Sequence, residues 1–325
     1  MLCILYVNAA GFLLGLAALS FERTLPVTAM RRWLWCIVIP ASIVLPGFYR
    51  FRHNWALSDL AGPAAHSAGH HVSGAASIAG LSPEFWTRVE ALDPAINVIW
   101  QILTGVLVIW AVINAMRVSH IIATGRGGRN STLDGVPVVI TESAGPATVG
   151  VLFPRVIVPQ WVLTLPVTQR RYVLNHENEH RRAYDATLLF LGSLPIVLAP
   201  WNLALWWQLR RLALAVEMDC DNRVVAALGN PRAYGELLLR VAEASSRGPR
   251  LQPAFAGSAG ALERRLRSLL APSPLHYIQR YLFPALALAF LAIVIRLPHP
   301  LIRPDRVHRT VTPTTVNSPI QKDAR

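Results

Sequence analysis

Four apolar segments dominate this sequence, and each is long enough to cross a lipid bilayer as a helix. A spanning helix needs about 20 mostly apolar residues, and the 325-residue chain supplies them at roughly 2–20, 33–49, 95–116 and 279–296. Hydrophobic residues make up 53% of the chain and charged residues only 15%. Soluble proteins carry about 25% charged residues. We therefore expect a multi-pass α-helical membrane protein.

The arginines predict how the chain is oriented. The formal net charge is +13, and Lys322 is the only lysine. Short cytoplasmic loops of membrane proteins are enriched in basic residues, and 21–32 and 117–278 are rich in arginine, whereas 51–94 is sparse. This pattern predicts that the N-terminus and 51–94 lie outside the cell and that 21–32 and 117–278 lie inside. It favours lipid over nucleic acid as the partner of the basic residues, and we expect no direct nucleic-acid binding.

The predicted organisation combines membrane helices with one cytoplasmic domain. Within 118–278, short β-branched runs predict strands, and they are followed by predicted helices at 167–185 and 203–226. We therefore expect a cytoplasmic α+β domain. The full plan is two transmembrane helices with a short cytoplasmic loop at 1–50, an extracytoplasmic loop at 51–94, a third transmembrane helix at 95–117, the cytoplasmic domain at 118–278, a last transmembrane helix at 279–297 and a short disordered extracytoplasmic tail at 298–325.

A His-Glu-x-x-His motif lies on the first of these cytoplasmic helices. His176 and His180 are four residues apart, so both imidazoles share one helix face and can bind one Zn²⁺ ion. Zinc lowers the pKa of a bound water to about 7. Glu177 is placed to take a proton from that water. Glu179 flanks the histidines almost symmetrically, and the known mechanics of the motif favour Glu177 as the catalytic base.

The second predicted helix carries Glu217 and Asp221, again four residues apart. A catalytic zinc takes three protein ligands and keeps one open position. We expect Glu217 to be the third ligand, and Asp221 to accept the distal N–H of a ligating histidine. Acidic helix faces are often simply solvated, but two motifs that together complete a tetrahedral site favour a metal centre.

The apolar stretch 186–208 lies between the two halves of this predicted site. If it were one full span, His180 and Glu217 would lie on opposite sides of the membrane and could not bind one ion. We therefore expect a re-entrant hairpin or a helix pair against the bilayer, bent near Pro195 or near 200–202. Non-helical backbone at membrane depth requires shielding by protein or by a water-filled cavity.

Other residues near and far from the motifs are interpreted as structural. Asp185 follows the motif, and its phase on a continuous helix would turn it away from His176, so we expect a structural or capping acid. Cys220 is interpreted as a small packed residue and not a ligand. A further group, His66, His70 and His71, lies in a stretch of small residues that we interpret as a loop, with metal binding or pH sensing as the alternative.

Several stretches resemble the BlaR/MecR family of integral-membrane zinc metallopeptidases. They are NHENEHRRAYD, APWNLALWW and EMDCDNRVV, preceded by the strand-like GPATVGVLFPRVIVPQ, and the resemblance covers roughly 95–277. It implies a protein of the bacterial inner (cytoplasmic) membrane and a gluzincin-like zinc metallopeptidase domain with His176, His180 and Glu217 as ligands and Glu177 as base. Full-length members carry a penicillin-binding sensor after the last span. We expect none here, because no Ser-x-x-Lys motif follows Pro298.

The resemblance also implies a function. The expected activity is hydrolysis of peptide bonds in a cytoplasmic or membrane-proximal protein during signal-dependent, antirepressor-like regulation. A cytoplasmic transcriptional repressor is the candidate substrate, and a homodimer is possible. Two alternatives stay open: a membrane quality-control protease of the HtpX/Ste24 type, which shares both motifs, and a non-catalytic membrane receptor or scaffold.

Overall fold

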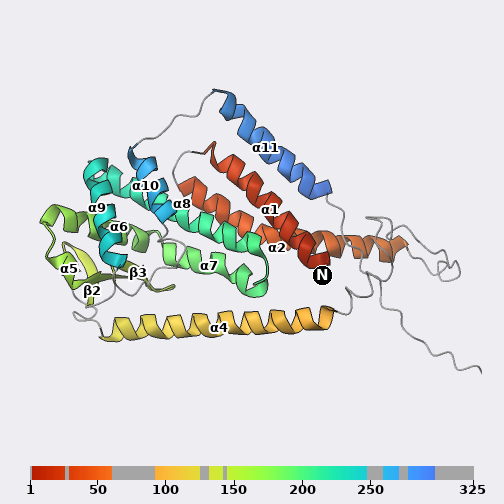
Figure 1. Cartoon of the computed structure of the whole chain (residues 1–325), viewed down its shortest axis with the longest axis horizontal. Helices are drawn as coiled ribbons and strands as arrows, with labels where there is room; N and C mark the ends of the chain where they lie inside the picture. Colours follow the sequence, from red (N-terminus) through yellow and green to blue (C-terminus); the bar gives the residue numbers. More distant parts are fainter. Residues whose placement is uncertain are drawn as a thin grey trace, which may run out of the picture.

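Figure 1 shows the computed structural model of the protein, in which long helices run beside one another and a small sheet lies at one end. The structure describes residues 2–25, 29–60, 92–124, 132–141, 145–246, 259–270 and 277–296. The predicted tail at 298–325 and the histidines His66, His70 and His71 lie outside the described residues. A mostly helical protein with a small mixed sheet agrees with the predicted fold class at this coarse level.

The elements follow one another from an apolar N-terminal part to a mixed middle part. The helices are α1 (Leu2–Glu22), α2 (Ala29–Leu60), α4 (Asp93–Thr124), α5 (Gln160–Leu163), α6 (Val167–Arg182), α7 (Asp185–Leu198), α8 (Leu203–Leu228), α9 (Pro231–Ser246), α10 (Ala259–Leu270) and α11 (Tyr277–Arg296). The strands are β1 (Thr132–Leu133), β2 (Val136–Thr141), β3 (Ala147–Val149) and β4 (Arg155–Pro159).

Three described helices contain a stretch that is long and apolar enough to cross a membrane: Ile4–Glu22, Ala29–Pro46 and Pro94–His120. The last of these, in α4, buries none of its residues inside the protein. A helix that is apolar and uncovered needs apolar surroundings such as lipid. The fourth predicted span corresponds to α11, whose apolar stretch Tyr281–Arg296 is shorter and whose helix packs along α1 (Figure 1). The orientation of these helices stays a prediction.

The apolar stretch between the two motifs folds as a helical hairpin. α7 ends at Leu198, the chain turns at 199–202, and α8 packs back against α7. Asn202 caps α8, because its side chain accepts a hydrogen bond from Ala204 N at 3.0 Å. The tip lies beside α1, since the Leu203 amide donates to Asn8 Oδ1 at 3.0 Å. The bend falls at the predicted residues, and its entry into a bilayer stays a prediction.

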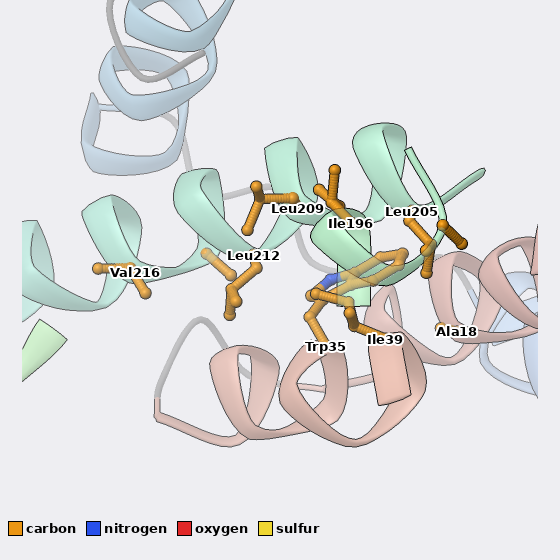
Figure 2. Close-up of a cluster of buried hydrophobic side chains, with 10 residues drawn as sticks. Ala18, Trp35, Ile39, Ile196, Leu205, Leu209, Leu212 and Val216 are labelled. Carbon is orange, nitrogen blue, oxygen red and sulfur yellow. The ribbon is translucent and has the colours of Figure 1, made fainter. Parts of the chain in front are cut away.

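An apolar core fixes the hairpin against the first two helices (Figure 2). Trp35 and Ile39 of α2 are fully buried against Leu205 and Leu212 of α8. α1 approaches closely at Gly15, where a Cβ atom would come within 2.2 Å of the Trp207 ring. Any larger residue at position 15 would require the Trp207 ring or the two helices to shift. α8 is therefore a rigid continuation of the packed helices, and it carries the second motif at its far end.

The sheet has the order β1-β2-β4-β3. β2 and β4 are parallel, and β3 pairs antiparallel with β4 from Ala147↔Ile157 to Val149↔Arg155. Val156 and Val158 of β4 pack with Val173 and Leu174 of α6 in a buried cluster. The β-branched residues thus form the strands as predicted, although 151–154 is a loop before β4. This packing places the edge strand β3 beside α6.

Candidate metal centre

The two motif histidines lie on the buried side of α6. Their Nε2 atoms are 3.2 Å apart, and the rings meet edge to face. Two nitrogens that each bind one zinc ion at 2.0–2.1 Å in a tetrahedral arrangement are about 3.3 Å apart. His176 and His180 are therefore spaced as a ligand pair for one ion.

Glu217 reaches the same two nitrogen atoms from α8. Its Oε2 is 3.7 Å from His176 Nε2, and its Oε1 is 3.9 Å from His180 Nε2. Oε2 is buried and accepts no hydrogen bond, although an Arg265 nitrogen lies 2.9 Å away within ion-pair distance. Buried acceptors are normally satisfied, so a cation between the histidines would complete this carboxylate. The structure brings the three predicted ligands together.

Cys220 is a fourth residue at this position. Potential ligand atoms of His176, His180 and Cys220 all lie within 4.8 Å of one another. The sulfur is 3.3 Å from His176 Nδ1 and 3.4 Å from the His176 carbonyl oxygen. Burial raises the pKa of the thiol to about 11. The sequence interpretation of Cys220 as merely packed missed its closeness to the histidines.

Glu177 lies next to the histidines and is tied to the edge strand. The Thr148 hydroxyl of β3 donates to the Glu177 carbonyl oxygen at 2.6 Å and lies 3.1 Å from Glu177 Oε2. Burial raises the pKa of the Glu177 carboxyl to about 7, an effect that nearby His180 opposes and the Glu217 carboxylate strengthens. Such a carboxyl can both accept and release a proton at neutral pH.

The prediction that Asp185 faces away from the site is wrong. Asp185 Oδ2 lies 2.8 Å from His180 Nδ1, and both groups are buried. The prediction assumed one helix over 167–185, whereas α6 ends at Arg182 and α7 begins at Asp185. Between them, Tyr184 adopts a left-handed conformation with φ of 53°, which is rare for a residue with a side chain. This break in helical phase turns Asp185 back towards His180.

Asp221 supports the other histidine through an intermediate. Its Oδ1 is 3.7 Å from His176 Nδ1, beyond the direct hydrogen bond that we expected. The Tyr234 hydroxyl of α9 lies between them, donating to Asp221 Oδ1 at 2.7 Å and lying 2.9 Å from His176 Nδ1. Burial raises the pKa of Tyr234 well above its ordinary value, so the phenol keeps its proton. Asp221 therefore supports His176 indirectly, through the Tyr234 hydroxyl.

Arg265 of α10 is a site residue that the sequence analysis missed. Its guanidinium forms two 2.7 Å hydrogen bonds with the Asp221 carboxylate and approaches Glu217. A signal was present in the helical spacing. Arg265 comes three residues after Leu262 and four before Leu269, which both pack on a buried cluster. An arginine on the apolar face of a helix predicts a buried partner.

A shallow pocket of about 300 Å³ lies between the β3–β4 loop and the end of α6. None of the histidines, Glu177, Glu217, Cys220, Asp185 or Asp221 lines it, so it is an additional surface and not the metal centre itself. Its lining combines apolar and basic side chains: Leu152, Phe153, Pro154, Arg155, Arg181, Arg182 and Tyr184.

Helices of membrane-spanning length and a buried pair of histidines with an adjoining carboxylate and thiol are the features of a membrane metallopeptidase. The family model of the BlaR1 peptidase M56 matches residues 5–269, and the chain belongs to this family. The family resemblance predicted from the sequence is thereby confirmed. No curated protein and no solved structure matches the chain.

Proposed function

We propose that this protein is a membrane-embedded zinc endopeptidase that cuts a cytoplasmic or membrane-proximal protein. The observation that carries the proposal is the 3.2 Å separation of the two histidine Nε2 atoms, with the Glu217 carboxylate beside both and Glu177 next in sequence. The family is one of metallopeptidases, which supports a metal at this position.

His176, His180 and Glu217 would hold the zinc ion. Glu217 is preferred over Cys220 as the third ligand because one of its oxygens lies near each histidine Nε2 and its buried Oε2 accepts no hydrogen bond, whereas the Cys220 thiol already contacts the Nδ1 and the carbonyl oxygen of His176. When bound, zinc acts as a Lewis acid that polarises the scissile carbonyl and lowers the pKa of water.

Glu177 would carry the proton during hydrolysis. Its carboxylate removes a proton from the attacking water and later delivers it to the leaving amine. A pKa of about 7 suits both steps. Asp185 and Tyr234 hold the two histidines in fixed orientations, because each contacts the Nδ1 atom of one ring.

The edge strand β3 is the proposed binding surface for the substrate. β3 pairs with β4 along one side and ends the sheet order. An extended peptide can add to such an edge by main-chain hydrogen bonds. The contact between Thr148 and Glu177 would place a peptide on β3 beside the catalytic base. A side chain of that peptide could then reach the apolar and basic pocket near Phe153.

The proposed role is signal-dependent regulation at the bacterial inner membrane, with the catalytic domain in the cytoplasm. Membership in the BlaR1 peptidase family and the excess of arginine in 117–278 support this role. A cytoplasmic transcriptional repressor is the proposed class of substrate, which makes the protein antirepressor-like.

The test compares two neighbouring glutamates in the full chain purified in detergent. Glu177→Gln is expected to lower cleavage of an unfolded protein substrate about 10²–10⁴-fold, while bound zinc stays at the wild-type level. Glu179→Gln is the matched control, because Glu179 pairs with Arg223 at 3.1 Å and not with the histidines.

Wild-type proteolysis in the Glu177→Gln protein would overturn the enzymatic role. Zinc content of His176→Ala and Glu217→Ala tests the ligands independently, and unchanged zinc in both would remove the proposed centre. Cleavage of many unfolded membrane proteins at similar rates would favour the quality-control alternative.

A further inference from the structure

We propose that Arg32, in the first turn of α2, is a positioning residue for His180 and acts through Asp185. The inference rests on the proposed function, because it takes His180 as a metal ligand. The apolar helix α2, which is distant in sequence from the histidines, would then help to orient one of the proposed metal ligands.

The link consists of one carboxylate shared by two partners. Asp185 Oδ2 lies 2.8 Å from His180 Nδ1, and Asp185 Oδ1 accepts a hydrogen bond from Arg32 Nη1 at 3.0 Å. The Arg32 side chain is 13% exposed and that of Asp185 is 3% exposed, so water competes little for either group. The position of the guanidinium therefore determines where the carboxylate can sit against the imidazole.

Arg32 also neutralises a second buried acid. Its Nη1 is 3.2 Å from Asp219 Oδ2. The other nearby guanidinium, Arg223, is 3.5 Å from both Asp185 and Asp219, and it lies closer to Glu179, at 3.1 Å. Without Arg32, the buried carboxylates of Asp185 and Asp219 would share the guanidinium of Arg223, which lies farther from them. Uncompensated buried charge is costly, and the Asp185 carboxylate would rotate away from its present position.

That movement would disturb His180. A ligating histidine whose second nitrogen donates to a carboxylate is held in the tautomer and ring orientation that present Nε2 to the metal. Loss of such a partner typically lowers metal affinity about 10–100-fold. The metal centre should therefore depend on the position of α2, because this helix carries Arg32 and packs against α8 through Trp35 and Ile39.

α2 contains one of the three stretches of membrane-spanning length among the described helices. The chain Arg32–Asp185–His180 is thus a direct physical connection from a candidate membrane helix to a metal ligand. A displacement of α2 relative to α7 would therefore change the Asp185 contact.

The first experiment compares adjacent arginines in the full chain in detergent, with zinc affinity measured by competition with a chelator. Arg32→Gln is expected to weaken zinc binding about tenfold. Arg31→Gln is the matched control and is expected to keep wild-type affinity. Arg31 lies on the same helix turn, but it donates to the Leu25 carbonyl oxygen at 2.6 Å and 3.1 Å.

A double mutant separates positioning from general loss of structure. If Arg32 acts through Asp185, Arg32→Gln added to Asp185→Asn weakens zinc binding no further than Asp185→Asn alone. The visible absorption of the Co²⁺-substituted protein gives a second readout, since it reports the ligand field. Its bands should shift in the same direction in Arg32→Gln and Asp185→Asn, and stay unchanged in Arg31→Gln.

Unchanged zinc affinity in Arg32→Gln, or fully additive losses in the double mutant, would overturn the inference. Should Arg32→Gln fail to fold, Arg32→Lys keeps the positive charge on a shorter side chain, without the planar guanidinium whose Nη1 reaches both carboxylates. It should lose affinity partially, and wild-type affinity in this variant would equally exclude the role. Zinc that stays bound in His176→Ala would instead contradict the proposed function.

Discussion

The two histidines of the centre are supported by aspartates in different ways. Asp185 contacts His180 directly at 2.8 Å, whereas Asp221 reaches His176 through the Tyr234 hydroxyl. From this difference we infer that one side mainly orients its histidine and the other mainly stabilises the fold. A direct carboxylate acts on the ligand itself, and a relayed one is freer to serve the surrounding structure.

The arginines on the two sides show the same division. Arg32 of α2 makes one hydrogen bond with Asp185, while Arg265 of α10 makes two with Asp221. Two-pronged guanidinium–carboxylate pairs are the stronger and more rigid arrangement. We therefore expect the Arg265 side to dominate stability and the Arg32 side to dominate ligand orientation. The predictions below test this contrast.

Arg265→Met should have the largest effect on stability. The Arg265 side chain is 11% exposed, and its loss leaves the Asp221 carboxylate buried and uncompensated. We expect a loss of about 3–5 kcal/mol in the free energy of unfolding. Denaturant unfolding of the zinc-free protein in detergent measures it.

Arg267→Met on the same helix is the control. Arg267 is 74% exposed and pairs with Glu263 on the surface, so its removal should cost at most about 1 kcal/mol. Equal losses for the two variants would show that Asp221 does not depend on Arg265.

Asp185→Asn and Asp221→Asn should affect different properties. Asp185→Asn removes the direct acceptor of His180 and is expected to lower zinc affinity about 10–100-fold with the smaller loss of stability. Asp221→Asn should mainly lower the free energy of unfolding and affect zinc affinity less. The reason is that the two hydrogen bonds from Arg265 would no longer be made to a charged carboxylate. Chelator competition and unfolding of the zinc-free proteins give both values. The same ratio of losses in both variants would refute the division of roles.

The residues that sequence reasoning grouped together are two pairs defined by helical spacing. His176 and His180, and likewise Glu217 and Asp221, are four residues apart, and that spacing fixes a shared helix face before any tertiary contact forms. The hairpin followed from the same logic, since two halves of one site must lie on one side of a membrane. These features are local or follow directly from local ones.

The residues that were missed depend on tertiary packing. Arg32 lies 153 positions from Asp185, and Arg265 lies 44 from Asp221. No periodicity connects such pairs. Asp185 was misplaced because a left-handed residue at Tyr184 breaks the helix, and Tyr184 is neither Gly, Asn nor Asp, the residues that usually signal this conformation. Only the register of Arg265 on the apolar face of α10 was readable in advance.

Tyr234→Phe should have an intermediate effect. It removes the hydroxyl between His176 and Asp221 and leaves buried polar atoms with one partner fewer, so we expect a loss of about 1–3 kcal/mol in stability. Zinc affinity should fall less than in Asp185→Asn, because the group that contacts the His176 ring is a neutral hydroxyl and not a carboxylate. Tyr172→Phe is the control, since its exposed hydroxyl bonds the Gly229 carbonyl oxygen. A loss of zinc affinity as large as that of Asp185→Asn would make the two supports equivalent.

Cys220→Ala should have the smallest effect on zinc binding. This variant tests whether Glu217 or Cys220 is the third zinc ligand. The sulfur contacts His176 at Nδ1, the nitrogen that Tyr234 also approaches, and it interacts with His180 as well. If Glu217 is the third ligand, Cys220→Ala keeps one zinc per chain, and Glu217→Ala loses it. Measured zinc content of the two purified variants compares them directly. Zinc lost from Cys220→Ala but kept by Glu217→Ala would make the thiolate the ligand, because a metal-bound sulfur gives up its proton despite a high intrinsic pKa.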